Sequence, residues 1–179
     1  MTAADIIASG GKAQAYAASV DDFERSAAMV AAIEADHGAI GILINNAGIA
    51  SRGQSVVDTD PAEMRRMVAT RSSSGFGAPY NMGKTAMEAL AYTPAREERD
   101  HGIRVSIGAP GLVVTDMGQR LIHAGQGVED IRTLDEFMPF GRVCQPADVV
   151  SMVRFSVTNE NPYLNRECLD CDGGRQNLR

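Results

Sequence analysis

The sequence has no tryptophan, and aromatic residues make up only 5% of its 179 residues. Hydrophobic residues still account for 44%, an ordinary share for a globular domain, so a core of useful size can form. That core has to be built from Ala, Val, Ile, Leu and the nine Met residues, which define packing less sharply than aromatic rings do. We therefore expect residues 1–179 to form a single domain with a somewhat soft interior.

Long hydrophobic runs and clusters of positive charge are also missing. No run approaches the length that crosses a bilayer, and the start of the chain lacks the basic flank and apolar core of a secretion signal. The net charge is −6, and the only dense basic spot, around Arg65, Arg66 and Arg71, is short. We expect a cytoplasmic protein that binds neither a membrane nor a nucleic acid.

Cysteine is scarce as well, with three residues. An odd number without a secretion signal favours reduced thiols over a disulfide framework. Cys168 and Cys171 form a C-x-x-C, but their surroundings resemble a strand, where positions three apart face opposite sides, whereas redox pairs of this kind begin a helix. A structural zinc needs four ligands, and only Cys144 and scattered histidines are left to complete it. We predict no metal site, with a small redox or metal module as the alternative.

The hydrophobic pattern predicts strands that alternate with helices. Residues 12–19 predict a strand, and the capping box at 21–24 predicts a helix to about residue 36. The apolar run 40–45 predicts a parallel strand buried on both faces. Strand, helix and strand in succession indicate an α/β fold.

Proline and glycine positions divide the rest of the chain. Asp60 and Pro61 predict a helix start. Pro79 begins a helix to about residue 99, in which Pro94 is an internal conflict that costs a hydrogen bond or a kink. The remaining expected elements are strands at 104–109 and 167–172, helices at 116–124 and 146–157, and a mixed, lid-like segment at 124–140.

Tyr80 and Lys84 carry the most informative chemistry. They lie four positions apart, so a helix places them on one face. A phenol has a reference pKa of about 10, and a fixed positive charge beside it favours the phenolate. Such a tyrosine can exchange a proton with a carbonyl group. Because this spacing also occurs in ordinary surface helices, other motifs have to decide between the two interpretations.

Three further runs accompany this pair, at Ile42 to Gly48, Arg104 to Thr115 and Cys171 to Gly174. In this order and at these distances they resemble the short-chain dehydrogenase/reductase family, whose marks are Asn-Asn-Ala-Gly, Tyr-x-x-x-Lys and Pro-Gly-x-x-x-Thr. The resemblance covers nearly the whole chain. It implies a Rossmann-like, doubly wound parallel sheet with flanking helices, incomplete in this chain.

The resemblance also implies an oxidoreductase that transfers hydride between NAD or NADP and a small alcohol or ketone. Tyr80 would be the general acid/base, Lys84 would hold the nicotinamide ribose, and Ser72 would bond the substrate oxygen. By the same resemblance the protein would form a homodimer or homotetramer. The cofactor-binding residues that it implies are Asn46, Ala47, Gly48, Tyr80, Lys84, Pro110, Gly111, Val113 and Thr115.

The chain departs from the family pattern at several points. The family opens with a strand and a glycine-rich turn whose following helix holds the pyrophosphate, and no such element precedes residue 12. Ser72 precedes Tyr80 by eight residues, where the family has about a dozen. Arg71 stands about where the family has a catalytic Asn, or residues 66–68 are the remnant of a lost strand. Ser19 stands where members often have an Asp near the adenine. We expect a chain that is truncated at its N-terminus and internally deleted.

The missing strands would separate those that remain. A buried strand without neighbours leaves N–H and C=O groups unpaired, at about 1–3 kcal/mol each. The sheet must then re-pair, borrow a partner or fail. Two functions therefore stay open, an NAD(P)-dependent oxidoreductase and a catalytically inactive remnant or interaction module that cannot hold a dinucleotide.

Overall fold

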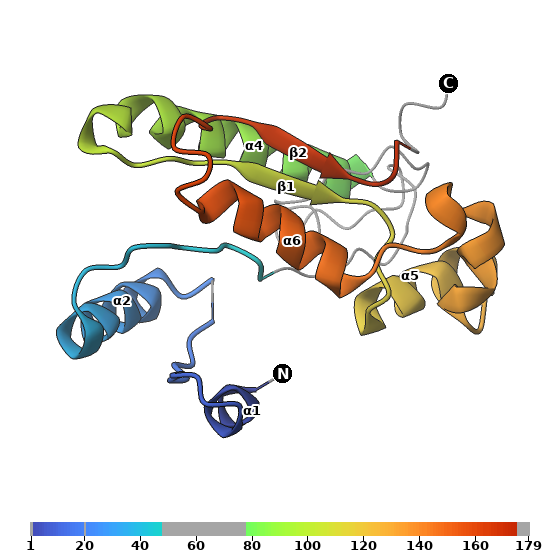
Figure 1. Cartoon of the computed structure of the whole chain (residues 1–179), viewed down its shortest axis with the longest axis horizontal. Helices are drawn as coiled ribbons and strands as arrows, with labels where there is room; N and C mark the ends of the chain where they lie inside the picture. Colours follow the sequence, from blue (N-terminus) through green and yellow to red (C-terminus); the bar gives the residue numbers. More distant parts are fainter. Residues whose placement is uncertain (1, 20, 48–77, 175–179) are drawn as a thin grey trace. The chain divides into compact units, whose positions relative to one another are not determined.

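A computed structural model describes residues 2–19, 21–47 and 78–174 of the chain (Figure 1). The chain divides into two compact units, Met1–Ala47 and Gly48–Arg179, which are considered separately below. The elements, in chain order, are α1 (Ala3–Ala8), α2 (Phe23–His37), α4 (Ala78–Glu97), η1 (Arg99–His101), β1 (Ile107–Pro110), α5 (Asp116–Gln126), η2 (Ile131–Phe137), η3 (Pro139–Gly141), α6 (Pro146–Val157) and β2 (Cys168–Cys171).

The first unit contains two helices with well-defined caps. Helix α1, which the sequence analysis missed, starts at a capping box in which the Thr2 amide donates to the Asp5 carboxylate at 2.6 Å. Helix α2 follows Asp22, whose carboxylate accepts the Arg25 amide at 2.9 Å. It ends at Gly38, where φ is 81°, a left-handed value that favours glycine. The helix predicted after the capping box at 21–24 is confirmed.

Residues 12–19 lie extended but form no strand among the described residues, so a strand prediction here was wrong. Side chains tie this segment to the end of α2 instead. The Tyr16 hydroxyl donates to Asp36 at 2.6 Å and lies 3.1 Å from His37 Nε2, and the Gln14 amide donates to Asp36 at 3.2 Å. The bond to the Asp36 carboxylate raises the pKa of Tyr16 to about 12. Tyr16 therefore stays a neutral donor.

The apolar segment 40–45 also forms no strand among the described residues, and the prediction of a strand buried on both faces was wrong. Ile42, Leu43 and Ile44 are 57%, 72% and 57% exposed. Hydrophobicity favours burial, but a strand also needs neighbours that take its backbone N–H and C=O groups.

The second unit is built around the parallel pair of β1 and β2 (Figure 1). Their register runs from Ile107 opposite Cys168 to Pro110 opposite Cys171. The strands predicted at 104–109 and 167–172 are confirmed, and with the helices around them they give an α/β fold.

Backbone pairing continues upstream of β1 through a side chain. The Val105 amide donates to Asn165 Oδ1 at 2.9 Å, and the Arg166 amide donates to the Val105 carbonyl at 2.8 Å. The Asn165 side chain also donates to the Ala95 carbonyl of α4 at 2.8 Å. Asn165 thereby joins the start of the sheet to the last turns of α4.

Arg104 fastens the end of α6 to the same region. Its guanidinium donates to the carbonyl of Asn161 at 2.7 Å and to those of Ser156, Thr158 and Leu164 at 3.3 to 3.4 Å. The carbonyls at the end of a helix have no partner within it, so a planar donor group with several N–H bonds stabilises them.

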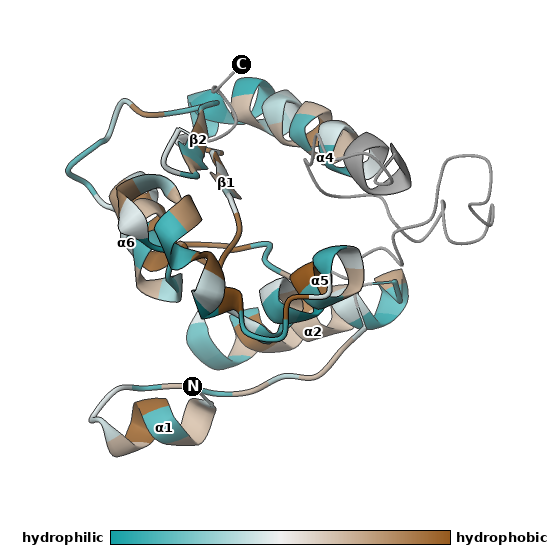
Figure 2. Cartoon of the chain, turned by 90° about the vertical axis from the view of Figure 1, so that its right-hand side faces the viewer, coloured by the Kyte–Doolittle hydropathy of each residue, from teal (hydrophilic) through white to brown (hydrophobic). Residues whose placement is uncertain are grey.

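Helix α6 packs closely on the two strands. A Cβ on Gly108 of β1 would lie 2.5 Å from the Met152 Cε atom, so a larger residue there would require the end of the Met152 side chain to move. The conflict expected at Pro94 falls in the last turn of α4, and the helix continues to Glu97. Figures 1 and 2 show α4 running along the strand pair in the opposite direction, so the amino end of α4 lies at the edge where β1 ends.

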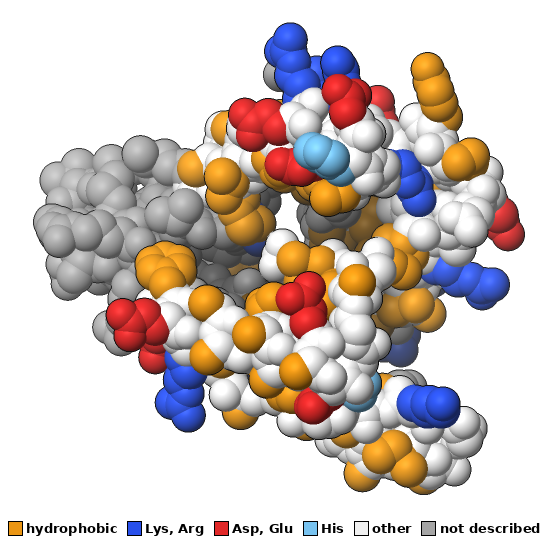
Figure 3. Space-filling view, turned by 90° about the vertical axis from the view of Figure 1, so that its left-hand side faces the viewer, with side chains coloured by type: hydrophobic (Ala, Val, Ile, Leu, Met, Phe, Trp, Pro, Cys, Tyr) orange, Lys and Arg blue, Asp and Glu red, His pale blue; other side chains and the backbone are white. Residues whose placement is uncertain are grey.

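A small core lies beyond the strand ends. Ile122 of α5, Ile131 of η2 and Val143 are buried there, and the half-buried residues packed on them are Leu112, Val114, Val128, Leu134 and Met138. The predicted lid-like segment thus contributes to the core through Ile131. Phe137 and Phe140, in contrast, are 71% and 88% exposed, and Figure 3 shows hydrophobic side chains on the surface among charged ones.

No helix in the described part of the chain has both the length and the apolar character that a membrane crossing requires.

We expect Gly118→Ala to destabilise the second unit. Gly118 is buried in the first turn of α5, where a Cβ would collide with the Val113 carbonyl oxygen. Because that carbonyl is backbone and cannot swing away, the free energy of unfolding should fall by about 2–3 kcal/mol. Gly125, on the same helix, has open space around it. Gly125→Ala should therefore raise stability by about 0.5–1 kcal/mol. Urea denaturation compares the two, and equal effects would contradict the close contact at Gly118.

Candidate functional site

Helix α4 places Tyr80 and Lys84 one turn apart near its amino end. Residues four apart on a helix share a face, as the sequence analysis assumed. The Tyr80 side chain lies outside the described residues, as do Ser72 and Gly48. Their predicted roles stay predictions.

Lys84 is half-buried, and burial lowers the pKa of its amine. Gly83 before it is buried, whereas Thr85, Ala86 and Met87 after it are exposed. A cation held away from water costs stability unless another group interacts with it. An exposed lysine would avoid that cost.

We expect Lys84→Met to leave the protein at least as stable as the parent at pH 7. The folded-state pKa lies below the unfolded value of about 10.4, so the folded parent carries the cost of a partly dehydrated charge at neutral pH. As pH rises through the folded pKa the lysine loses its proton and the parent gains stability relative to the variant. Thermal unfolding from pH 7 to 10 should therefore show a difference that shrinks with pH.

Arg96→Met is the matched control, because Arg96 is exposed on the same helix. A Lys84→Met protein that unfolds at a much lower temperature than both would show that Lys84 is a structural residue.

Three of the predicted cofactor residues lie at the carboxyl end of β1. Pro110 ends the strand, and the Gly111 amide donates to the Cys171 carbonyl at 3.1 Å. Val113 forms a single parallel bridge with Cys144. In α/β sheets ligands bind at the carboxyl ends of strands. The segment is therefore held in a position where a cofactor can reach it.

Thr115 is the N-cap of α5, and its hydroxyl accepts the Gly118 amide at 3.0 Å. The same hydroxyl lies 3.4 Å from the Val113 carbonyl, to which it donates. Thr115 thus fixes how the segment after β1 turns into α5. The structure places the four predicted residues from Pro110 to Thr115 on one continuous turn.

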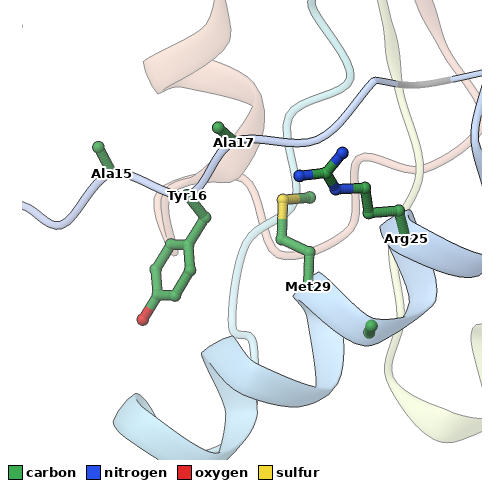
Figure 4. Close-up of a pocket in the computed structure, with 6 residues that line it drawn as sticks. Ala15, Tyr16, Ala17, Arg25 and Met29 are labelled. Carbon is green, nitrogen blue, oxygen red and sulfur yellow. The ribbon is translucent and has the colours of Figure 1, made fainter.

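The first unit contains two other predicted cofactor residues, Asn46 and Ala47, both exposed. Ser19 donates its hydroxyl to Asp21, beside the start of α2. A shallow, open pocket lies between the extended segment and α2, where Arg25 and Met29 reach toward Ala17 (Figure 4). The sequence analysis did not single out this pocket, whose lining residues are Ala15, Tyr16, Ala17, Arg25, Ala28 and Met29.

Among the residues that the structure describes, no group of three or more His, Cys, Asp or Glu side chains is arranged so that it could hold a metal ion. The C-x-x-C residues Cys168 and Cys171 lie on β2, as a strand prediction required.

Comparisons with known proteins agree on one family. The family model described as enoyl-(acyl carrier protein) reductase matches residues 1–78 and 68–176. A 3α-hydroxysteroid dehydrogenase of Mediterraneibacter gnavus is 28% identical over 187 residues, covering 87% of this chain and 72% of the relative. A crystal structure of a putative gluconate dehydrogenase from Agrobacterium tumefaciens has a TM-score of 0.87 at 21% identity, covering 99% of this chain and 81% of the other.

A structure of ElxO with NADP bound has a TM-score of 0.79 at 20% identity, with 91% of this chain and 78% of that one covered. At these identities the solved structures show a shared fold.

Proposed function

The chain belongs to the short-chain dehydrogenase/reductase family of NAD(P)-dependent oxidoreductases, and on this premise we propose that it transfers hydride between a nicotinamide cofactor and a small alcohol or ketone. The observation that carries the proposal is the half-buried Lys84, one helical turn after Tyr80. The cost of partly burying the Lys84 ammonium is offset if the ammonium donates hydrogen bonds to the hydroxyl groups of a ribose. We place this activity in the cytoplasm and expect a homodimer or homotetramer.

In this proposal Lys84 acts twice. Its ammonium donates to the ribose hydroxyls, and its charge favours the ionised form of the Tyr80 phenol. Tyr80 donates a proton to the substrate carbonyl during reduction and accepts one from the hydroxyl during oxidation. Ser72 bonds the same substrate oxygen while its charge changes. NAD or NADP supplies the hydride for reduction and accepts it for oxidation.

The residues fit such a cofactor in part. The turn from Pro110 to Thr115 and the amino end of α4 lie at the same end of the strand pair (Figure 1), and α/β sheets bind ligands at the carboxyl ends of their strands, which supports the proposal. Asn46, Ala47 and Gly48 would contribute from the run after 40–45. The structure of ElxO with bound NADP is a reason to test the phosphorylated cofactor first.

NADPH fluorescence tests the binding step. Purified protein should increase the emission of NADPH to saturation, and Lys84→Met should weaken the affinity at least tenfold, because the ribose hydroxyls lose their donor. Arg96→Met, exposed on the same helix, should bind like the parent. A parent that is folded by circular dichroism and gives no saturable signal with either NADPH or NADH would contradict the proposal.

Tyr80→Phe tests the chemical step. Removing the phenolic hydroxyl should lower kcat for reduction of a probe ketone such as cyclohexanone by about 100-fold or more, a far larger effect than any loss of NADPH affinity. Absorbance at the reduced nicotinamide band follows turnover. A Tyr80→Phe protein with the parent's kcat would remove Tyr80 from the mechanism.

A second function is favoured by the unpaired segments of the first unit. Residues 12–19 and 40–45 do not form the strands that a complete family member needs, and Leu43 is 72% exposed. The alignment with the steroid dehydrogenase spans 187 positions although it covers only 87% of this 179-residue chain, so the relative has residues without a counterpart here. The alternative is a single partial Rossmann-like domain that is catalytically inactive or binds a partner. A folded protein without cofactor binding would support it.

A further inference from the structure

Two cysteines far apart in the sequence flank the segment that leaves β1. Cys171 is the last residue of β2, and its carbonyl accepts the Gly111 amide at 3.1 Å. Cys144 pairs with Val113 in an isolated parallel bridge, and its carbonyl accepts the Val114 amide at 2.9 Å. The backbone carbonyls of both cysteines are therefore held by the same short stretch of chain, residues 111–114.

The segments that carry the two cysteines also pack on each other directly. A Cβ on Gly173, two residues after Cys171, would lie 2.5 Å from the Pro139 Cβ atom and 3.4 Å from the Phe140 ring. The turn after β2 thus rests on η3, which leads into the Cys144 segment. This contact does not depend on the pairing with residues 111–114, and it brings the same two stretches together.

The thiols themselves interact. Burial, followed by the charge and the hydrogen bond of the Cys171 thiol and then by those of the Asp148 carboxylate, raises the pKa of Cys144 to about 12. Both side chains are half-buried, and both are free thiols. The adjacent Cys168 lies three positions from Cys171 on the same strand, so its side chain leaves the opposite face of β2.

We propose that Cys144 and Cys171 form a reversible disulfide bond with each other, by thiol–disulfide exchange with small-molecule disulfides such as glutathione disulfide. The pair differs from the C-x-x-C pair that the sequence displays. It shares Cys171 with that motif and replaces Cys168 by a partner that only the fold brings close. The proposal stands on the geometry of the second unit and is independent of the hydride-transfer proposal.

The reaction proceeds in two exchanges. The Cys171 thiolate attacks one sulfur of glutathione disulfide, the S–S bond breaks, and one glutathione leaves and takes up a proton. Cys144 then loses its proton and attacks the Cys171 sulfur of the mixed disulfide, releasing the second glutathione. In sum, two protein thiols are oxidised to one disulfide, and one glutathione disulfide is reduced to two thiols.

Proton loss from Cys144 sets the pace of the second exchange. While Cys171 can carry a charge, that charge opposes ionisation of its neighbour. In the mixed disulfide this charge is gone, so Cys144 ionises more readily than in the reduced protein. The rate of disulfide formation should therefore rise with pH between 7 and 9, roughly in proportion to the thiolate fraction.

The new bond would close a loop that contains α6 and the carbonyls held by Arg104. Closing such a loop restricts the unfolded chain more than the folded one. The oxidised protein should unfold at a temperature about 5 °C higher than the reduced protein. Dithiothreitol should reverse the shift.

The test incubates the full-length protein with glutathione disulfide at pH 8 and measures intact mass and linked peptides. The parent should lose about 2 Da and yield a peptide that joins Cys144 to Cys171. Cys168→Ser is the matched control, since Cys168 lies on the same strand and is equally half-buried, and it should give the same link. Cys144→Ser and Cys171→Ser should stop at a glutathione adduct.

Three results would overturn the proposal. They are a link between Cys168 and Cys171, mixed adducts alone in the parent, and loss of the link in Cys168→Ser. Circular dichroism of each reduced variant establishes that the folds are comparable. NADPH affinity is measured on the same samples, so failure of the disulfide and failure of the cofactor site are seen separately.

Discussion

The parallel pairing of β1 with β2 is the interaction on which the second unit depends. It fixes where the chain leaves the sheet at Pro110, and it gives α6 a surface on which Met152 approaches Gly108 closely. Upstream, Asn165 and Arg104 extend the same junction to α4 and to the end of α6. Without the pair, neither the turn toward α5 nor the position of α4 along the sheet would be defined.

A second constraint is the supply of strand neighbours. The hydrophobic pattern predicts strands at residues 12–19 and 40–45, yet neither segment forms a strand in the described structure. Burial of side chains alone does not make a strand, because each backbone amide and carbonyl also needs a partner. Lys84 and the turn after β1 lie in the second unit, where β1 and β2 pair. Asn46 lies in the first unit, just after residues 40–45, which form no strand among the described residues.

Features with local causes could be predicted from the sequence. Helices α5 and α6 begin after Thr115 and at Pro146, where a cap and a proline act within one turn. Helix α1 has such a local signal too, in the capping box of Thr2 and Asp5, although no helix was predicted there. The strand predicted at 40–45 could not be judged locally, because a strand forms only where neighbouring strands take its backbone N–H and C=O groups. The meeting of Cys144 with Cys171 likewise depends on tertiary contacts that no spacing rule contains.

The distance along the chain between the two halves of the sheet has a consequence for how the protein is made. Val105 and its partner Asn165 are 60 residues apart, and α5, η2, η3 and α6 lie between them. A ribosome must therefore synthesise all of these elements before β1 meets its only neighbour among the described strands. Until then β1 and α6 expose their apolar faces. The growing chain thus carries these apolar faces without their partners over about a third of its length.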